Sequence, residues 1–328
     1  MSTGPNHRII RSSFVTKRSV NGITKAGIDL SEESIQRAVE ALDEDRVDDA
    51  LNILEPLVEN DFDDPDALVY LGIAYVQAEK PKKAVEVLER ADELIEEHCV
   101  VSLFLGRALR ILNRFDEAED HLRTAIRLDP NESEAWLDLG KCLYNRGDYG
   151  SAVQVWEDAK GKFPNDLGIR GMYALGLYRL GDYSAAADEW AAIHRLEPSL
   201  MAAISNYAYL LLIQDRIFEA APFVGRAHQI DSDDYRSQIL LGELRLLAGE
   251  HDGALDCFTK VIKQDPHNVE ALARLALLSG MIKDEEALRH YLDRAEDEAG
   301  KTPESWRGLC YVYAKLGWDE EFRNCLIR

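Results

Sequence analysis

The sequence lacks any apolar run that could cross a bilayer, which would take about 20 residues. The best candidate, residues 202–213, is too short and is interrupted by Ser205 and Asn206. Cysteine is also scarce, and the five cysteines are scattered, with no C-x-x-C pair: Cys99, Cys142, Cys257, Cys310 and Cys325. An odd number of scattered cysteines suits reduced thiols, so the sequence predicts a cytoplasmic protein without a membrane span.

Catalytic and metal-binding motifs are missing as well. None of the eight histidines belongs to an H-E-x-x-H motif or stands near cysteines at zinc-ligand spacing. The sequence has neither a phosphate-binding glycine loop nor a nucleophile elbow. It therefore predicts a protein that is not an enzyme and that holds no metal or other cofactor.

Positive charge is in short supply. The chain has 38 Lys and Arg against 60 Asp and Glu, a net charge of −22, which excludes nucleic acid as a partner because phosphates would be repelled. Residues 1–30 differ, because no acidic residue occurs before Asp29. We expect them to form a basic, flexible extension. A transit peptide and an arm that docks on the acidic body are the alternatives.

What the chain has instead is a repeat, most regular at residues 133–166. Its first half reads Trp136-x2-Leu139-Gly140-x2-Leu143, and its second half carries Ala152 and, four residues later, Trp156. These spacings place each set on one face of a helix, so they predict two packed helices. Because Gly140 and Ala152 are small, the two helix axes can approach closely, with the tryptophans beside them.

The 34-residue frame extends over the chain from residue 31. Repeats begin at Ser31, Pro65, Cys99, Ser133, Leu167, Met201, Tyr235, Val269 and Pro303. Position 8 is small in each repeat: Ala38, Gly72, Gly106, Gly140, Ala174, Ala208, Gly242, Ala276 and Cys310. Position 20 is alanine in the first seven repeats. In the eighth, Ala287 stands one place early, which predicts a turn shorter by one residue. Asn131 and Glu134 predict a capping box before the first helix of repeat four.

The repeat resembles the tetratricopeptide family, whose pattern is W-x2-L-G-x2-Y…A-x3-F…P, with Leu143 in place of Tyr and Trp156 in place of Phe. The resemblance covers residues 31–328. It implies an all-α, right-handed superhelical solenoid of about nine helix-turn-helix repeats. It also implies a concave groove, lined by the first helix of each repeat, where such proteins usually bind segments of partner proteins.

The face of the first helices that should line this groove is apolar at many positions. Positions 9 and 12 of each repeat point away from the second helix. They hold residues such as Val39, Ile73, Tyr144, Tyr178 and Leu277, where surface helices usually carry charge. We expect such a face to be covered by a partner or narrowed by the superhelix itself.

Repeats three to five add cationic residues to this face. The predicted peptide-binding residues are Arg107, Arg110, Lys141, Tyr144, Asn145, Leu175, Tyr178, Arg179, Tyr209 and Leu212. One interpretation is a cationic seat for an acidic peptide or a free carboxylate, with tyrosines as anchors. The other is that these cations only pair with neighbours such as Glu134 and Asp138. Position 9 never holds Asn, so the resemblance does not extend to the clamp by which some family members bind a chaperone's C-terminus.

The sequence thus predicts an adaptor or assembly factor that binds a protein partner. The alternative is a structural scaffold that oligomerises with itself through its C-terminal end or its basic extension.

Overall fold

The computed structural model describes residues 25–59, 64–95, 97–300 and 306–327, and it is helical wherever it has regular structure. Most of the basic extension, residues 1–24, lies outside the described part. The first helices of the repeats are α1 (Lys25–Asp43), α3 (Pro65–Gln77), α5 (Cys99–Ile111), α7 (Ser133–Arg146), α9 (Leu167–Arg179), α11 (Met201–Ile213), α13 (Tyr235–Leu247), α15 (Val269–Met281) and α17 (Trp306–Leu316). The second helices are α2 (Val47–Glu59), α4 (Pro81–Leu94), α6 (Phe115–Leu128), α8 (Tyr149–Lys162), α10 (Tyr183–Leu196), α12 (Ile217–Ile230), α14 (His251–Gln264), α16 (Glu285–Ala299) and α18 (Asp319–Ile327).

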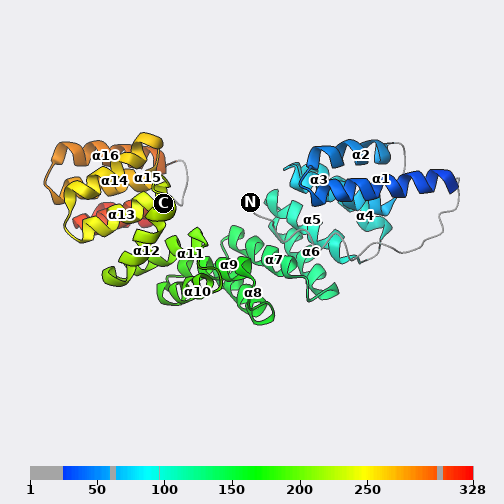
Figure 1. Cartoon of the computed structure of the whole chain (residues 1–328), viewed down its shortest axis with the longest axis horizontal. Coiled ribbons are helices and arrows are strands. Elements are labelled where there is room, and N and C mark those ends of the chain that lie inside the picture. The colour runs from blue at the N-terminus through cyan, green and yellow to red at the C-terminus, as the bar shows by residue number, and fades with distance from the viewer. Residues whose placement is uncertain (1–24, 60–63, 96, 301–305, 328) are drawn as a thin grey trace. The chain divides into compact units, whose positions relative to one another are not determined.

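The helices follow the 34-residue frame closely. From α3 to α15, every first helix begins at the residue that opens its repeat, whereas α1 begins six residues early, at Lys25. The chain divides into two compact units, residues 1–180 and 181–328. Within each unit every helix packs on the next one, as in α3, α4 and α5, so each unit is a stack of helix pairs (Figure 1).

Glycine at position 8 sets how closely the two helices of a pair approach. A Cβ atom added to Gly140 would lie 2.1 Å from Nε1 of Trp156, and one added to Gly242 would lie 2.4 Å from Cε1 of Phe258. Trp156 is fully buried, so its ring lies directly on the glycine. Trp136 does not share this core, because its Nε1 donates to the carbonyl oxygen of Pro130 at 3.1 Å near the start of α7.

Position 15, in the turn between the paired helices, adopts a left-handed backbone in all nine repeats. Four of the repeats have glycine there, as at Gly147, where φ is 91°. The other five have residues with a side chain: Asp45, Glu79, Asn113, Asp215 and Lys283, with φ between 56° and 62°. Glu79 and Lys283 incur a steric penalty of roughly 1–2 kcal/mol in this conformation, whereas Asp and Asn adopt it more readily.

We expect Glu79→Gly to raise the free energy of unfolding by about 0.5–1 kcal/mol, because relief of the left-handed strain outweighs the added backbone entropy of glycine. Urea unfolding measures the change. The matched control is Glu86→Gly on the exposed side of α4, which should lower the free energy of unfolding by about 1 kcal/mol. Equal losses from both substitutions would contradict the strain at position 15.

Two local predictions are wrong. The capping box does not form, since Glu132 caps α7 by accepting from the backbone N–H of Glu134, whose own carboxylate pairs elsewhere. The turn of repeat eight is not shortened either, because α16 begins at Glu285, at the same distance from α15 as α14 is from α13. Leu288, which replaces alanine at position 20, is nonetheless part of the core, at 9% exposure.

The expectation of five reduced cysteines is also wrong. Cys310 of α17 and Cys325 of α18 form a disulfide, with their Cα atoms 5.7 Å apart. Cys99, Cys142 and Cys257 are free. The sequence separation of 15 residues matches no short motif, and only the pairing of α17 with α18 brings the two cysteines together.

Candidate functional site

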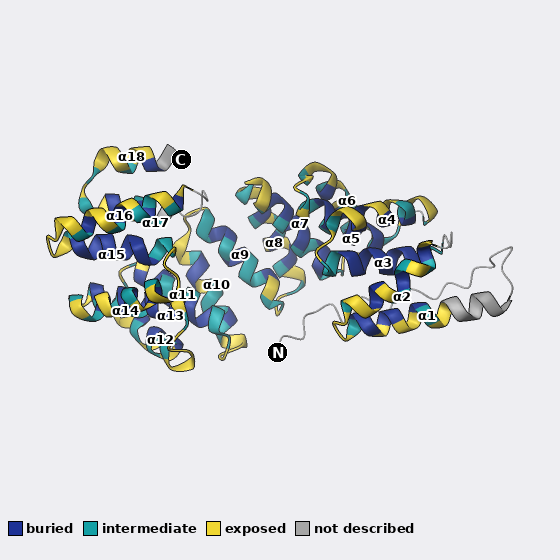
Figure 2. Ribbon diagram, turned by 90° about the horizontal axis from the view of Figure 1, so that it is seen from above, coloured by how far each residue is buried: buried dark blue, intermediate teal, exposed yellow. Residues whose placement is uncertain are grey.

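First helices of consecutive repeats contact one another: α3 with α5, α5 with α7 and α7 with α9 in the first unit, and α11 with α13 and α13 with α15 in the second. This first-helix face therefore covers much of its own apolar surface. Val39, Ile73 and Leu277 at position 9 are at most 8% exposed. Figure 2 shows α3, α5 and α15 as largely buried helices. Neighbouring first helices, rather than a partner, therefore bury these three residues.

The residue that opens the predicted site, Arg107 of α5, lies across from two acidic residues of α7. Its guanidinium donates to the carboxylates of Glu134 and Asp138. The side chains are 16%, 8% and 2% exposed, so this is a buried ion pair. Burial alone would lower the pKa of Arg107, but the two negative charges outweigh it and raise the pKa. Arg107 is thus neutralised by the neighbours that the sequence suggested.

Two further cations lie near the carboxylate of Asp138. Arg110 Nη2 lies 3.6 Å from Asp138 Oδ1, and Lys141 Nζ lies 3.7 Å from the same oxygen. Three cationic side chains therefore lie near Glu134 and Asp138, and a third carboxylate, that of Glu132, also interacts with the charge of Arg107. The Nε atom of Arg110 is buried and has no hydrogen-bond partner.

The next predicted residue along this face, Arg179 of α9, lies among aromatic rings. Arg179 Nε donates to the hydroxyl of Tyr144, and the guanidinium carbon lies 5.5 Å from the centre of that ring. Tyr149 packs edge-on against Tyr144 with 5.0 Å between ring centres. The cation and the two rings therefore hold one another in place.

The remaining predicted residues divide between the units. Asn145 is exposed, and Leu175 and Tyr178 are half-buried, all in the first unit. Tyr209 and Leu212 belong to the second unit, where Leu212 is only 6% exposed and offers a partner almost no surface. We define the α5–α7–α9 strip as the part in the first unit: Arg107, Arg110, Lys141, Tyr144, Asn145, Leu175, Tyr178 and Arg179.

A second buried ion pair, which we did not predict from the sequence, lies in the other unit. Arg274 of α15 pairs with Glu243 of α13, and the two side chains are 7% and 9% exposed. Arg274 also lies 4.7 Å from the ring centre of Tyr311. Arg107 with Asp138 and Glu243 with Arg274 both join position 9 of one repeat to position 6 of the next, with opposite polarity. Charges at these positions, 31 residues apart, are the signal that could have revealed the pair.

Glu270, one helical turn before Arg274, makes this cluster sensitive to pH. Burial raises the pKa of Glu270 above its ordinary 4.5, while Arg274 partly opposes that rise. Between the two pKa values the folded state binds more protons than the unfolded state, so the contribution of Glu270 to stability falls as pH rises.

We expect Glu270→Gln to raise the free energy of unfolding at pH 7, because a neutral side chain avoids the cost of a buried carboxylate. The gain should vanish below pH 4.5, where the carboxyl is protonated in both states. Urea unfolding of both proteins at pH 4 and pH 7 measures the difference. A gain of the same size at both pH values would contradict the role given to this carboxyl.

No metal site accompanies these clusters, since the described residues contain no group of three or more His, Cys, Asp or Glu that could hold an ion. Likewise, none of the described helices is both long and apolar enough to cross a membrane.

Comparison with known families agrees with the repeat frame. Residues 105–166 and 236–268 match two family models that are both described as the tetratricopeptide repeat. The chain belongs to the tetratricopeptide repeat family. Residues 43–125 of this tetratricopeptide repeat protein also match the model of the anaphase-promoting complex, cyclosome, subunit 3. The fold is that of protein–protein interaction modules, which are generally non-catalytic.

Curated relatives match only a small share of their own length. The human protein O-mannosyl-transferase TMTC1 is 30% identical over 93 residues, which are 27% of this chain and 10% of that protein. The cellulose synthase 2 operon protein C of Komagataeibacter xylinus is 26% identical over 309 residues, which are 86% of this chain and 23% of that protein. The tetratricopeptide repeat chain thus spans between a tenth and about a quarter of these relatives.

A solved structure supports the fold. The C-terminal part of a TPR repeat-containing protein from Cytophaga hutchinsonii is similar with a TM-score of 0.57 and 15% identity. The similarity covers 74% of this tetratricopeptide repeat chain and 99% of the other. At this identity the likeness concerns the fold alone.

Proposed function

We propose that this protein is a non-catalytic adaptor that binds an acidic segment of a partner protein on the α5–α7–α9 strip. The observation that carries the proposal is the convergence of three cationic side chains, Arg107, Arg110 and Lys141, around Glu134 and Asp138. Lys141 is the most accessible of the three cations, with a side chain that is 33% exposed, so a carboxylate of a partner could pair with it.

The aromatic end of the α5–α7–α9 strip favours a bound segment that also carries apolar side chains. Tyr144, Leu175 and Tyr178 are half-buried and lie on α7 and α9, next to the cations. Half-buried aromatic side chains are typical anchors of protein interfaces, since they add contact area at little cost in conformational entropy. We therefore propose a peptide with one or more carboxylates followed by apolar side chains.

The test selects binders from a random 12-residue peptide library on the immobilised full-length protein and measures their dissociation constants with variants. Arg110→Glu with Lys141→Glu should weaken binding and reduce its dependence on salt, because both cations steer and orient the carboxylate. Arg107 is unsuitable for reversal, since Arg107→Glu would place three carboxylates together in a buried site. Tyr178→Ala should weaken binding by about 2 kcal/mol.

The matched control is Glu157→Lys on the exposed side of α8, which changes charge by the same amount per residue in the opposite direction and lies outside the strip. It should leave the dissociation constant unchanged. If Glu157→Lys weakens the peptide as much as the strip variants do, recognition lies on the second helices and the proposal fails. Amidation of the peptide's C-terminus separates a free carboxylate from an acidic side chain as the bound group.

The scaffold alternative makes a different prediction. A self-assembling chain should increase in average mass with concentration in light scattering, whereas an adaptor of the kind we propose should not.

Location in the cytoplasm stays a prediction. The free thiols of Cys99, Cys142 and Cys257 fit a reducing compartment, but the disulfide is typical of an oxidising one. Microscopy of the full-length protein in its own cells would decide it.

A further inference from the structure

The last helix, α18, is attached to the rest of the second unit in an unusual way. It has nine residues, fewer than an isolated helix needs to be stable in water, roughly 12. Its first turn, Asp319, Glu320 and Glu321, is exposed. Among the side chains of α18 that the structure describes, Cys325 is the buried one, at 5% exposure, and it forms the disulfide. Tertiary contacts must therefore hold α18 in place, and the disulfide is a main one.

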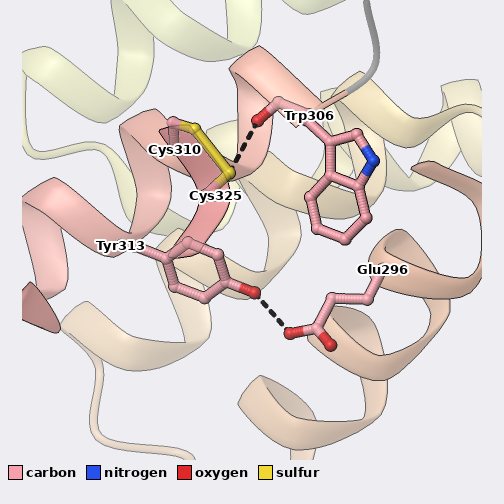
Figure 3. Close-up of a disulfide and its surroundings, with 5 residues drawn as sticks. All are labelled: Glu296, Trp306, Cys310, Tyr313 and Cys325. Atoms are coloured by element: carbon pink, nitrogen blue, oxygen red, sulfur yellow. Dashed lines mark hydrogen bonds between the residues drawn. A yellow bond between two sulfur atoms is a disulfide. The ribbon is translucent and has the colours of Figure 1, made fainter. Parts of the chain in front are cut away.

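The partner helix α17 is fixed independently of that bond. Leu309 and Val312 are fully buried in the core of the second unit. The hydroxyl of Tyr313 donates to the carboxylate of Glu296 on α16 (Figure 3). Tyr311 lies against Arg274 of α15. Loss of the disulfide would leave all these contacts of α17 intact.

Few described contacts besides the disulfide hold α18. Phe322 is half-buried against the core, and Trp318, just before the helix, stacks on Tyr313 with 6.2 Å between ring centres. Sγ of Cys325 also lies 3.3 Å from the backbone oxygen of Trp306 (Figure 3). The two sides of the bond thus differ, because α17 is anchored by several buried side chains, whereas Cys325 is the one buried residue among the described side chains of α18.

We propose that Cys310–Cys325 is a redox latch, which holds α18 on α17 when oxidised and releases α18 when reduced. Release would uncover the side of α17 that carries Cys310 and Tyr313. The inference is independent of what the α5–α7–α9 strip binds, since it concerns the other unit.

Reduction of the disulfide takes two electrons, which a dithiol reductant can supply. One thiolate of the dithiol attacks Sγ of Cys310, which is half-buried and hence more accessible than Cys325, and Cys325 leaves as a thiolate. The second thiol of the reductant then displaces Cys310. The dithiol becomes a disulfide, its two protons pass to the protein thiols, and the protein disulfide is reduced by two electrons.

The latch is tested by hydrogen–deuterium exchange of the full chain, measured with and without dithiothreitol. Before each measurement, titration of the free thiols in an unfolded sample establishes the redox state. Without reductant we expect three free thiols, and with it five. Reduction should speed amide exchange in α18 at least tenfold, while exchange in α15, α16 and α17 changes less than twofold. Unchanged exchange in α18, or an equal rise in α17 and α18, would overturn the latch, as would five free thiols without reductant.

Two variants control for side effects of the reductant. Cys310→Ser with Cys325→Ser should exchange fast in α18 under both conditions and show no response to dithiothreitol. Cys257→Ser removes a buried free thiol of α14 and should keep the full response. A double serine variant that still protects α18 as well as the oxidised protein does would show that the disulfide is not what holds the helix.

Discussion

Gly140→Leu is expected to lower the free energy of unfolding by about 3 kcal/mol, at the upper end of what overpacking a core costs. Even the first added carbon would lie 2.1 Å from Nε1 of Trp156, well inside van der Waals contact. Trp156 cannot move aside easily, because its ring is fully buried and its Nε1 donates to the carbonyl oxygen of Leu137 at 3.3 Å. The two helices α7 and α8 would have to separate.

The matched control for this prediction is Gly161→Ala in the next helix. No atom lies within 4 Å of a Cβ added there, and the residue is exposed. It should raise the free energy of unfolding by roughly 0.5–1 kcal/mol, as removal of a helix glycine does. Urea unfolding distinguishes the two. In a stacked repeat, the damage from Gly140→Leu should stay near repeat four. An unchanged unfolding midpoint would refute the helix pairing.

Arg274→Met is expected to cost about 3–5 kcal/mol, because it leaves Glu243 buried without its cation. Burial alone would lower the pKa of Arg274, but the charges of Glu243 and Glu270 raise it. Those carboxylates thus depend on the guanidinium that the substitution removes. Thermal or urea unfolding measures the loss.

The double variant Arg274→Met with Glu243→Met separates charge from packing. With both charges gone, no uncompensated ion is left between α13 and α15, so much of the stability should return. If the double variant is as unstable as Arg274→Met alone, lost packing rather than an unpaired Glu243 explains the effect.

The fold could be predicted from the sequence because the repeats share one residue pattern. The small residue at position 8 and the alanine at position 20 of most repeats can be recognised in the sequence alone. They define the 34-residue frame, and the first helices from α3 to α15 begin where that frame begins. The left-handed turn is indicated by the residue type only where glycine occurs, as at Gly147. At Glu79 and Lys283 the same backbone is imposed by the neighbouring helices, against the preference of the residue.

Contacts between repeats were harder to predict. Glu134 suggested a capping box with Asn131, but its carboxylate pairs with Arg107 of the preceding repeat, since a buried cation outcompetes a local backbone N–H. The pairing of Cys310 with Cys325 depends on how one turn places two helices, which spacing alone does not express. The candidate residues could be named from the helical face, but their mutual pairing and the burial of Leu212 required the structure.

The most direct test of the proposed function is the footprint of a selected acidic peptide on the full-length protein, measured by hydrogen–deuterium exchange with amidated and free peptide. The proposal predicts slower exchange in α5, α7 and α9, with little change in α6 and α8, and loss of the footprint in Arg110→Glu with Lys141→Glu. Protection confined to α6 and α8, or a footprint that survives the charge reversal, would contradict recognition by the α5–α7–α9 strip.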